Sequence, residues 1–174
     1  DFSYLKGLQA QGFPLLLFDR ITGELDVHKV TANNIQGAYQ ATTHLISSGY
    51  TKIAHLSSKS TLAMTHERFE GYKQALATHQ VGYKEELVKF CNTSDPNKAD
   101  ERIAKAMADL LLQQPEAIFT ATDLLSTKAL AYLNDHGYSI PEDIALIGFS
   151  NSDLAPILNP SLSTVRQPSK QIGE

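Results

Sequence analysis

The 174-residue sequence has a single cysteine, Cys91, no tryptophan and two methionines. One cysteine excludes an internal disulfide and a zinc site built from several cysteines, so Cys91 is expected to be a small buried residue. No apolar run approaches the ~20 residues that a membrane-spanning helix needs, so we expect no membrane partner. The first residues also lack the basic and apolar segments of a signal peptide. These absences favour a reduced, cytoplasmic protein.

Positive charge is also scarce. The chain has 15 Lys and Arg against 19 Asp and Glu, which gives a formal net charge of −4 and a pI of about 5.8. A domain that grips DNA phosphates by itself normally has the opposite balance. This stretch of the protein is therefore not expected to bind nucleic acid.

Motifs that hold cofactors or perform catalysis are absent. There is no G-x-G-x-x-G and no G-x-x-x-x-G-K-[ST] sequence, and the six histidines include no H-x-x-x-H pair, so we expect no cofactor and no metal site. The nearest approach to a nucleophile motif surrounds Ser150, but a nucleophile elbow needs glycine where Ser152 stands. We interpret this segment as a loop in which Asn151 or Ser152 caps a turn, and we predict that the protein is not an enzyme.

The chain does have an alternation of short apolar runs and helical patterns. Strands are expected at residues 15–18, 27–31, 53–56, 87–90, 117–119 and 144–149, and helices at 35–48, 66–78, 124–136 and behind Asp95-Pro96. This alternation predicts an α/β fold with a parallel sheet, flanking helices and right-handed crossovers. Because ligands of such sheets bind at the carboxyl ends of the strands, the residues that follow each strand are the first candidates for a site.

Several segments form a recognisable series. They include Arg68-Phe69-Glu70-Gly71-Tyr72, the stretch I-P-E-D-I-A-L-I-G-F at residues 140–149, and Leu162-Ser163-Thr164-Val165-Arg166-Gln167-Pro168. In this order, the segments resemble the effector-binding core of the lactose-repressor (LacI/GalR) family of bacterial transcription regulators. The resemblance extends from about residue 13 to residue 174.

The resemblance implies a periplasmic-binding-protein-like type I fold with two lobes and a ligand between them. It implies that residues 1–31 are a remnant of the N-terminal lobe, residues 32–165 are the C-terminal lobe and residues 166–174 begin the return to the N-terminal lobe. Members of the family begin with a helix-turn-helix that binds DNA and a hinge helix, which this chain lacks, and they are usually dimers.

The expected function is therefore the effector-sensing domain of a LacI-type transcriptional regulator. A small metabolite, a sugar or sugar derivative, is expected to bind in the cleft between the lobes. The protein is expected to be a homodimer and to bind DNA through the missing helix-turn-helix. The alternative is a transport-associated periplasmic sugar-binding protein of the same fold. An upstream signal peptide in place of a DNA-binding head would distinguish it.

The resemblance assigns ligand contacts to individual residues. Arg68 matches the family arginine that grips the ligand, a role that suits the five donors of a guanidinium. Its alternative is a solvated arginine near a helix start, where its charge opposes the helix dipole. Asp19 matches a cleft residue of sugar-responsive members, and its alternative is a salt bridge to Arg20 or a turn cap.

Two further candidates follow the strand at residues 117–119. Thr122 stands where relatives often place a polar residue that faces the ligand. Asp123 is either a helix N-cap or a ligand contact. Ser150 is the main departure, because the family usually has aspartate there. Serine keeps the hydrogen bonding but loses the charge, which disfavours a cationic ligand.

The remaining candidates concern the polarity of the pocket. Leu62 and Met64 stand where purine-responsive and some sugar-responsive relatives place polar side chains. They either line a more apolar pocket or pack under the loop. Thr93 is a candidate for the pocket wall. These departures leave open that a protein co-regulator takes part in regulation.

Overall fold

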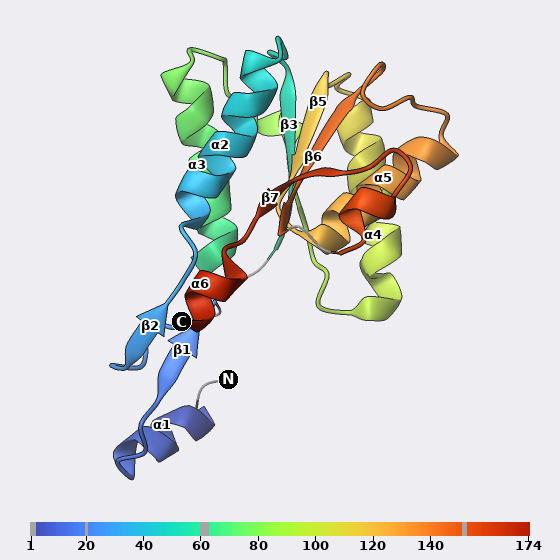
Figure 1. The fold of residues 1–174 in the computed structure, drawn as a ribbon. Helices are drawn as coiled ribbons and strands as arrows, with labels where there is room; N and C mark the ends of the chain where they lie inside the picture. The colour runs from blue at the N-terminus through green and yellow to red at the C-terminus, as the bar shows by residue number, and fades with distance from the viewer. Residues whose placement is uncertain (1–2, 20, 60–62, 151–152) are drawn as a thin grey trace.

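The computed structural model describes residues 3–19, 21–59, 63–150 and 153–174. Its elements are shown in Figure 1. They are α1 (Ser3–Ala10), β1 (Leu16–Phe18), β2 (His28–Val30), α2 (Asn34–Ser47), β3 (Ile53–Ser58), α3 (Ala63–Thr78), η1 (Glu85–Leu87), β4 (Val88–Cys91), α4 (Pro96–Leu111), β5 (Ala117–Thr120), α5 (Asp123–Asp135), β6 (Ala145–Ser150), η2 (Ala155–Ile157), β7 (Ser163–Arg166) and α6 (Ser169–Gly173), where η marks a 3-10 helix.

The main sheet has five strands in the order β4-β3-β5-β6-β7, and every neighbouring pair is parallel. Helices α2 and α3 cover one face, and α4 and α5 cover the other (Figure 1). This arrangement confirms the α/β fold with a parallel sheet and flanking helices that the sequence predicts.

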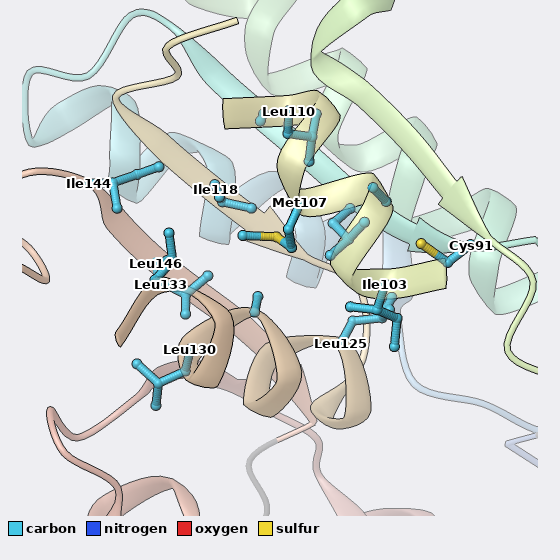
Figure 2. Close-up of a cluster of buried hydrophobic side chains, with 14 of the residues drawn as sticks. Cys91, Ile103, Met107, Leu110, Ile118, Leu125, Leu130, Leu133, Ile144 and Leu146 are labelled. Atoms are coloured by element: carbon cyan, nitrogen blue, oxygen red, sulfur yellow. The ribbon is translucent and has the colours of Figure 1, made fainter. Parts of the chain in front are cut away.

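Alternate residues of each strand supply two separate hydrophobic cores, because successive side chains of a strand point to opposite faces. In β3, Ile53 packs with the α2 and α3 side, whereas Ala54 and Leu56 pack with the α4 and α5 side. Figure 2 shows the second core, in which Met107 of α4 and Leu133 of α5 gather beside the sheet. Burial on both faces explains why the strands are continuous apolar runs.

The first two strands form a separate sheet. β1 and β2 pair in parallel over three residues each, and with α1 they extend away from the five-stranded sheet (Figure 1). The side chains of Leu16 and Phe18 are 57% and 64% exposed. This small sheet therefore leaves apolar side chains open to solvent.

Most helix boundaries follow the expected signals. The Asp95 side chain caps α4 by accepting from the Asn97 amide at 3.1 Å, and Pro96 occupies the first turn. Gly49 and Gly137 adopt positive φ angles of 97° and 76° directly after α2 and α5, as the helix stops require. None of the described helices is both long and apolar enough to cross a membrane.

Candidate functional site

The order of the strands marks one place in the sheet as the expected binding crevice. The chain passes from β3 outward to the edge strand β4 and then returns to β5 on the other side of β3. Such a reversal opens a crevice at the carboxyl ends of the two central strands. After β3 the chain leads to α3, which holds the candidate Arg68. After β5 it leads to α5, where the candidate Thr122 directly precedes the helix and Asp123 begins it.

Arg68 is buried next to the residue that follows β5, Ala121, with 1% of its surface exposed. Its Nε donates to Asn34 Oδ1 at 3.0 Å, and its Nη1 donates to the Ala121 carbonyl at 2.6 Å. The guanidinium carbon lies 3.8 Å from the centre of the Phe149 ring, a cation–π geometry. The interpretation of Arg68 as a solvated surface arginine is therefore wrong.

Burial and acidic neighbours have opposite effects on the pKa of the Arg68 guanidinium. Burial lowers its pKa to about 10, while the carboxylates of Asp19, Asp123 and Glu67 raise it, so the group stays charged at neutral pH. Its Nη2 is buried and has no hydrogen-bond partner among the described residues. An unpaired buried donor costs about 1–3 kcal/mol, so this nitrogen favours an acceptor supplied from outside.

The Arg68-x-x-Gly71-Tyr72 pattern on α3 explains how the arginine is positioned. Tyr72 Oη donates to the Ile53 carbonyl of β3 at 2.9 Å, and burial raises the pKa of this phenol far above its usual range. Gly71 lies against α2 so closely that a β-carbon there would come within 2.8 Å of Ala38 Cβ. Tyr72 therefore fixes α3 to the sheet and Gly71 fixes it to α2, about one turn after Arg68.

Two residues that hold the arginine were not predicted from the sequence. Asn34 is 4% exposed, accepts from Arg68, and donates through Nδ2 to Glu67 Oε2 at 2.8 Å. The doublet Asn33-Asn34 could have indicated a second role, because a helix N-cap needs only one asparagine. Asn33 is that cap, because its side chain accepts from the Gln36 amide at 3.0 Å, which leaves Asn34 for the site. The Phe149 ring had no comparable signal, because only the fold brings this residue of β6 under the Arg68 side chain.

The structure separates the roles of the two candidates at the start of α5. Thr122 is the N-cap, with its side chain accepting from the Leu125 amide at 3.4 Å. The interpretation of Asp123 as the cap is therefore wrong, for Asp123 lies in the first turn, half-buried, and its carboxylate acts on the Arg68 charge. Asp123 is thus part of the electrostatic surroundings of the site.

Two candidates end strands with positive φ angles. Asp19 follows β1 with φ of 58°, donates its amide to the Val30 carbonyl at 3.0 Å and acts on the Arg68 charge. Ser150 ends β6 with φ of 117° and pairs in register with Arg166 of β7. Such angles are uncommon outside glycine and store backbone strain, which is often found beside functional sites.

The last candidates make no hydrogen bond or ion pair with this group in the part of the chain that the structure describes. Met64 and Thr93 are half-buried, and among the described residues neither makes a polar contact with Arg68. Leu62 lies outside the described residues, as do Arg20, Asn151 and Ser152. Within the described ranges, no group of three or more His, Cys, Asp and Glu side chains is placed to hold a metal ion.

Comparison with known proteins identifies the architecture around this crevice. Residues 42–174 match the family described as a periplasmic binding protein-like domain. The chain belongs to this family. Its similarity to known transcriptional regulators also confirms the resemblance to the LacI-type effector-binding core.

Three relatives of this periplasmic binding protein-like domain show the similarity. The HTH-type transcriptional repressor PurR of Mannheimia succiniciproducens is 28% identical over 100% of this chain and 49% of its own length. A complex of the transcriptional regulator CelR with cellobiose has 32% identity and a TM-score of 0.83, over 95% of this chain and 50% of that one. A LacI family regulator from Enterococcus faecium with bound ribose has 28% identity and a TM-score of 0.85, over 97% and 61%. The chain thus spans about half the length of the curated relatives it matches.

Proposed function

We propose that this chain is the effector-sensing domain of a LacI-type transcriptional regulator that binds a sugar or sugar derivative beside Arg68 and is not an enzyme. The observation that carries the proposal is the buried Arg68 guanidinium, which keeps one donor unpaired among the described residues next to the end of β5. A bound effector regulates only if it binds two states of the protein unequally.

The charges around Arg68 favour a neutral polyol. One guanidinium against the three carboxylates of Asp19, Asp123 and Glu67 leaves a formal charge of −2, which repels an anionic ligand. A sugar hydroxyl can accept from Arg68 Nη2 and donate to a carboxylate. The ribose and the cellobiose in the two related complexes are neutral ligands of this kind.

The small sheet of β1 and β2 supports the proposed division of the chain. We assign residues 1–31 and 166–174 to the N-terminal lobe and residues 32–165 to the C-terminal lobe. The exposed Leu16 and Phe18 side chains would then be covered by the rest of the N-terminal lobe in the whole protein. That protein is proposed to act in the cytoplasm and to bind DNA through a helix-turn-helix.

Replacing Arg68 by lysine is expected to weaken sugar binding about 10- to 100-fold in the whole protein, since it removes a charge-assisted hydrogen bond worth about 1.5–3 kcal/mol. Lysine keeps the charge, but its single nitrogen cannot replace a guanidinium, which offers Nη2 to a ligand while Nε and Nη1 keep their own hydrogen bonds. A screen of neutral sugars by thermal shift identifies the ligand, because saturation at 100-fold the Kd adds about 2.7 kcal/mol. Calorimetry then compares the two proteins.

Arg102→Lys is the matched control, because Arg102 is a half-buried arginine of α4 whose Nη1 donates to a backbone carbonyl. Unchanged affinity in folded Arg68→Lys would reject the site. The whole protein is expected to select specific fragments from genomic DNA, and the same sugar is expected to change its affinity for them. A protein that binds sugar but selects no DNA would instead support the transport-associated alternative.

We further propose that the whole protein is a homodimer that buries an apolar surface beside α5. Leu124 on α5 is 45% exposed, and Leu154 and Ile157 near η2 are 53% and 74% exposed. Their neighbours Leu125 and Ala155 share one hydrophobic core, which places both elements on the same side of the sheet.

Changing Leu124 and Ile157 together to glutamate is expected to raise the dimer dissociation constant at least about tenfold, because charges are depleted in the cores of such interfaces. Light scattering after gel filtration at several concentrations measures this change. Leu112→Glu is the control, since Leu112 is 79% exposed and ends α4 outside this surface. Equal effects of both variants would contradict the proposed interface.

A further inference from the structure

A pocket lies at the outer edge of the five-stranded sheet, beside α4 and the edge strand β4. It has a volume of about 280 Å³. None of the residues that line it takes part in the contacts of Arg68. The lining residues are Lys59, Lys89, Phe90, Cys91, Asn92, Arg102, Lys105, Ala106 and Asp109.

The pocket is strongly basic in an acidic protein. It holds four of the chain's 15 Lys and Arg residues and a single carboxylate, that of Asp109, for a formal charge of +3. The rest of the chain then has 11 cations against 18 carboxylates, or −7. Among the described residues, no ion pair within 4 Å neutralises Lys59, Lys89 or Lys105. The positive charge is therefore available to a ligand.

The cations of the pocket come from different elements, among them β4 and α4. Lys89 alternates with Val88 along β4, and Val88 packs with the α2 and α3 side, so Lys89 lies on the α4 side. Arg102, Lys105 and Asp109 occupy one stripe of α4, because positions three and four apart share a helix face. Lys89 of β4 and the charged stripe of α4 thus line the same pocket.

Backbone contacts fix the base of the pocket. The Lys59 amide donates to the Cys91 carbonyl at 2.6 Å, which ties the end of β3 to the end of β4. Arg102 Nη1 donates to the Asn92 carbonyl at 3.0 Å, and this bond orients the guanidinium. Burial raises the pKa of the Cys91 thiol to about 11, so no thiolate opposes the cations at neutral pH.

We propose that this pocket binds the phosphate group of a small phosphorylated molecule. Lysine ammonium groups and an arginine guanidinium are the usual phosphate ligands of proteins. The volume is near the lower limit of small-molecule pockets, which suits a mono- or diphosphate with a short organic body. The site differs from the crevice beside Arg68 in both place and charge, so it goes beyond the proposed function.

Edge protection and DNA binding are two roles that suit these cations less well. Lysines on an edge strand can simply prevent pairing with other chains, but that role accounts for Lys89 alone and not for the stripe on α4. A surface for DNA needs cations spread along a long stripe, whereas these surround one small concavity in a chain of net charge −4. A small anionic ligand therefore fits the geometry best.

The test is calorimetry with inorganic pyrophosphate and with ribose 5-phosphate, at ~0.1 M salt so that exposed charges are screened beyond about 10 Å. Both are expected to bind saturably to the whole protein. The double variant Lys89→Gln/Lys105→Gln is expected to weaken binding at least about tenfold, as the loss of two charge-assisted contacts implies. Free ribose is expected not to compete with pyrophosphate.

The control is Lys84→Gln/Lys98→Gln, which removes the same charge at exposed positions outside the pocket, with Lys98 also on α4. It is expected to leave pyrophosphate binding within about twofold, because distant exposed charges are screened. Arg68→Lys should leave it unchanged, so failure of the sugar site and failure of this site are distinguishable. Equal weakening by both double variants would overturn the proposal. So would binding of duplex DNA or an acidic peptide at this pocket without binding of pyrophosphate.

Discussion

Replacing Gly71 by alanine is expected to destabilise the protein by at least about 3 kcal/mol, the upper part of the range for overpacked cores. A β-carbon at this position would lie 2.8 Å from Ala38 Cβ, 2.9 Å from the Tyr39 amide nitrogen and closer still to the Ile35 carbonyl oxygen. Two of these neighbours are backbone atoms of α2, which cannot move without displacing the helix. The two helices would therefore have to separate.

The sign of this effect is informative, because alanine in a helix interior is otherwise better than glycine by about 1 kcal/mol. Urea denaturation measures the free energy of unfolding. Gly7→Ala in α1 is the control, since a β-carbon at Gly7 meets nothing within 4 Å and should cost no stability. A Gly71→Ala protein within about 1 kcal/mol of the parent would contradict the close α2–α3 contact.

Acidification is expected to destabilise the protein through His55, a fully buried histidine in the centre of β3. Its Nδ1 donates to the Phe119 carbonyl at 3.1 Å, and its Nε2 has no partner among the described residues. The rings of Tyr72 and Phe119 each lie 5.0 Å from the imidazole, centre to centre. Burial lowers the pKa of His55 from 6.5 to about 3, although the hydrogen bond to Phe119 opposes the shift.

The direction follows from proton binding. Between pH 6.5 and about 3 the unfolded chain carries a proton on His55 that the folded protein does not. The stability contributed by neutral His55 is therefore complete above pH 6.5 and decreases by about 1.4 kcal/mol per pH unit as the pH falls toward 3.

Denaturation at a series of pH values compares the protein with His55→Leu, which removes the titrating group from the apolar site. The slope of stability against pH below 6.5 is expected to fall by up to about 1.4 kcal/mol per unit in this variant. His66→Gln serves as the control, because His66 is an exposed histidine of α3. An unchanged slope in His55→Leu would show that the folded protein accepts a proton at His55.

The fold followed from the sequence where local chemistry decides structure. Buried parallel strands show as apolar runs, and Asp95 and Gly49 mark helix ends through contacts with their own neighbours. Strand β7 was not predicted as a strand, because its residues are exposed or half-buried and no apolar run announces it. Helix α1 was missed for a similar reason, since none of its residues is buried.

The candidate site was predictable only in part. The family resemblance singled out Arg68, but its burial depends on Asn34 of α2 and Phe149 of β6, which are distant in sequence. Whether Asp123 or Thr122 caps α5 was decided by backbone geometry that both residue types can adopt. Contacts of this kind belong to the assembled helices and sheet, and no local pattern encodes them.

The hydrogen bond between Arg68 and Asn34 connects the candidate site directly to the start of α2. Asn34 begins α2 just after the chain leaves β2, and its amide bonds back to the Ala32 carbonyl at 2.9 Å. Gly71 allows the same helix to pack closely against α3. A ligand that displaces the guanidinium is therefore expected to displace the start of α2, which connects the small sheet to the rest of the chain. The Asn34 side-chain amide transmits this displacement.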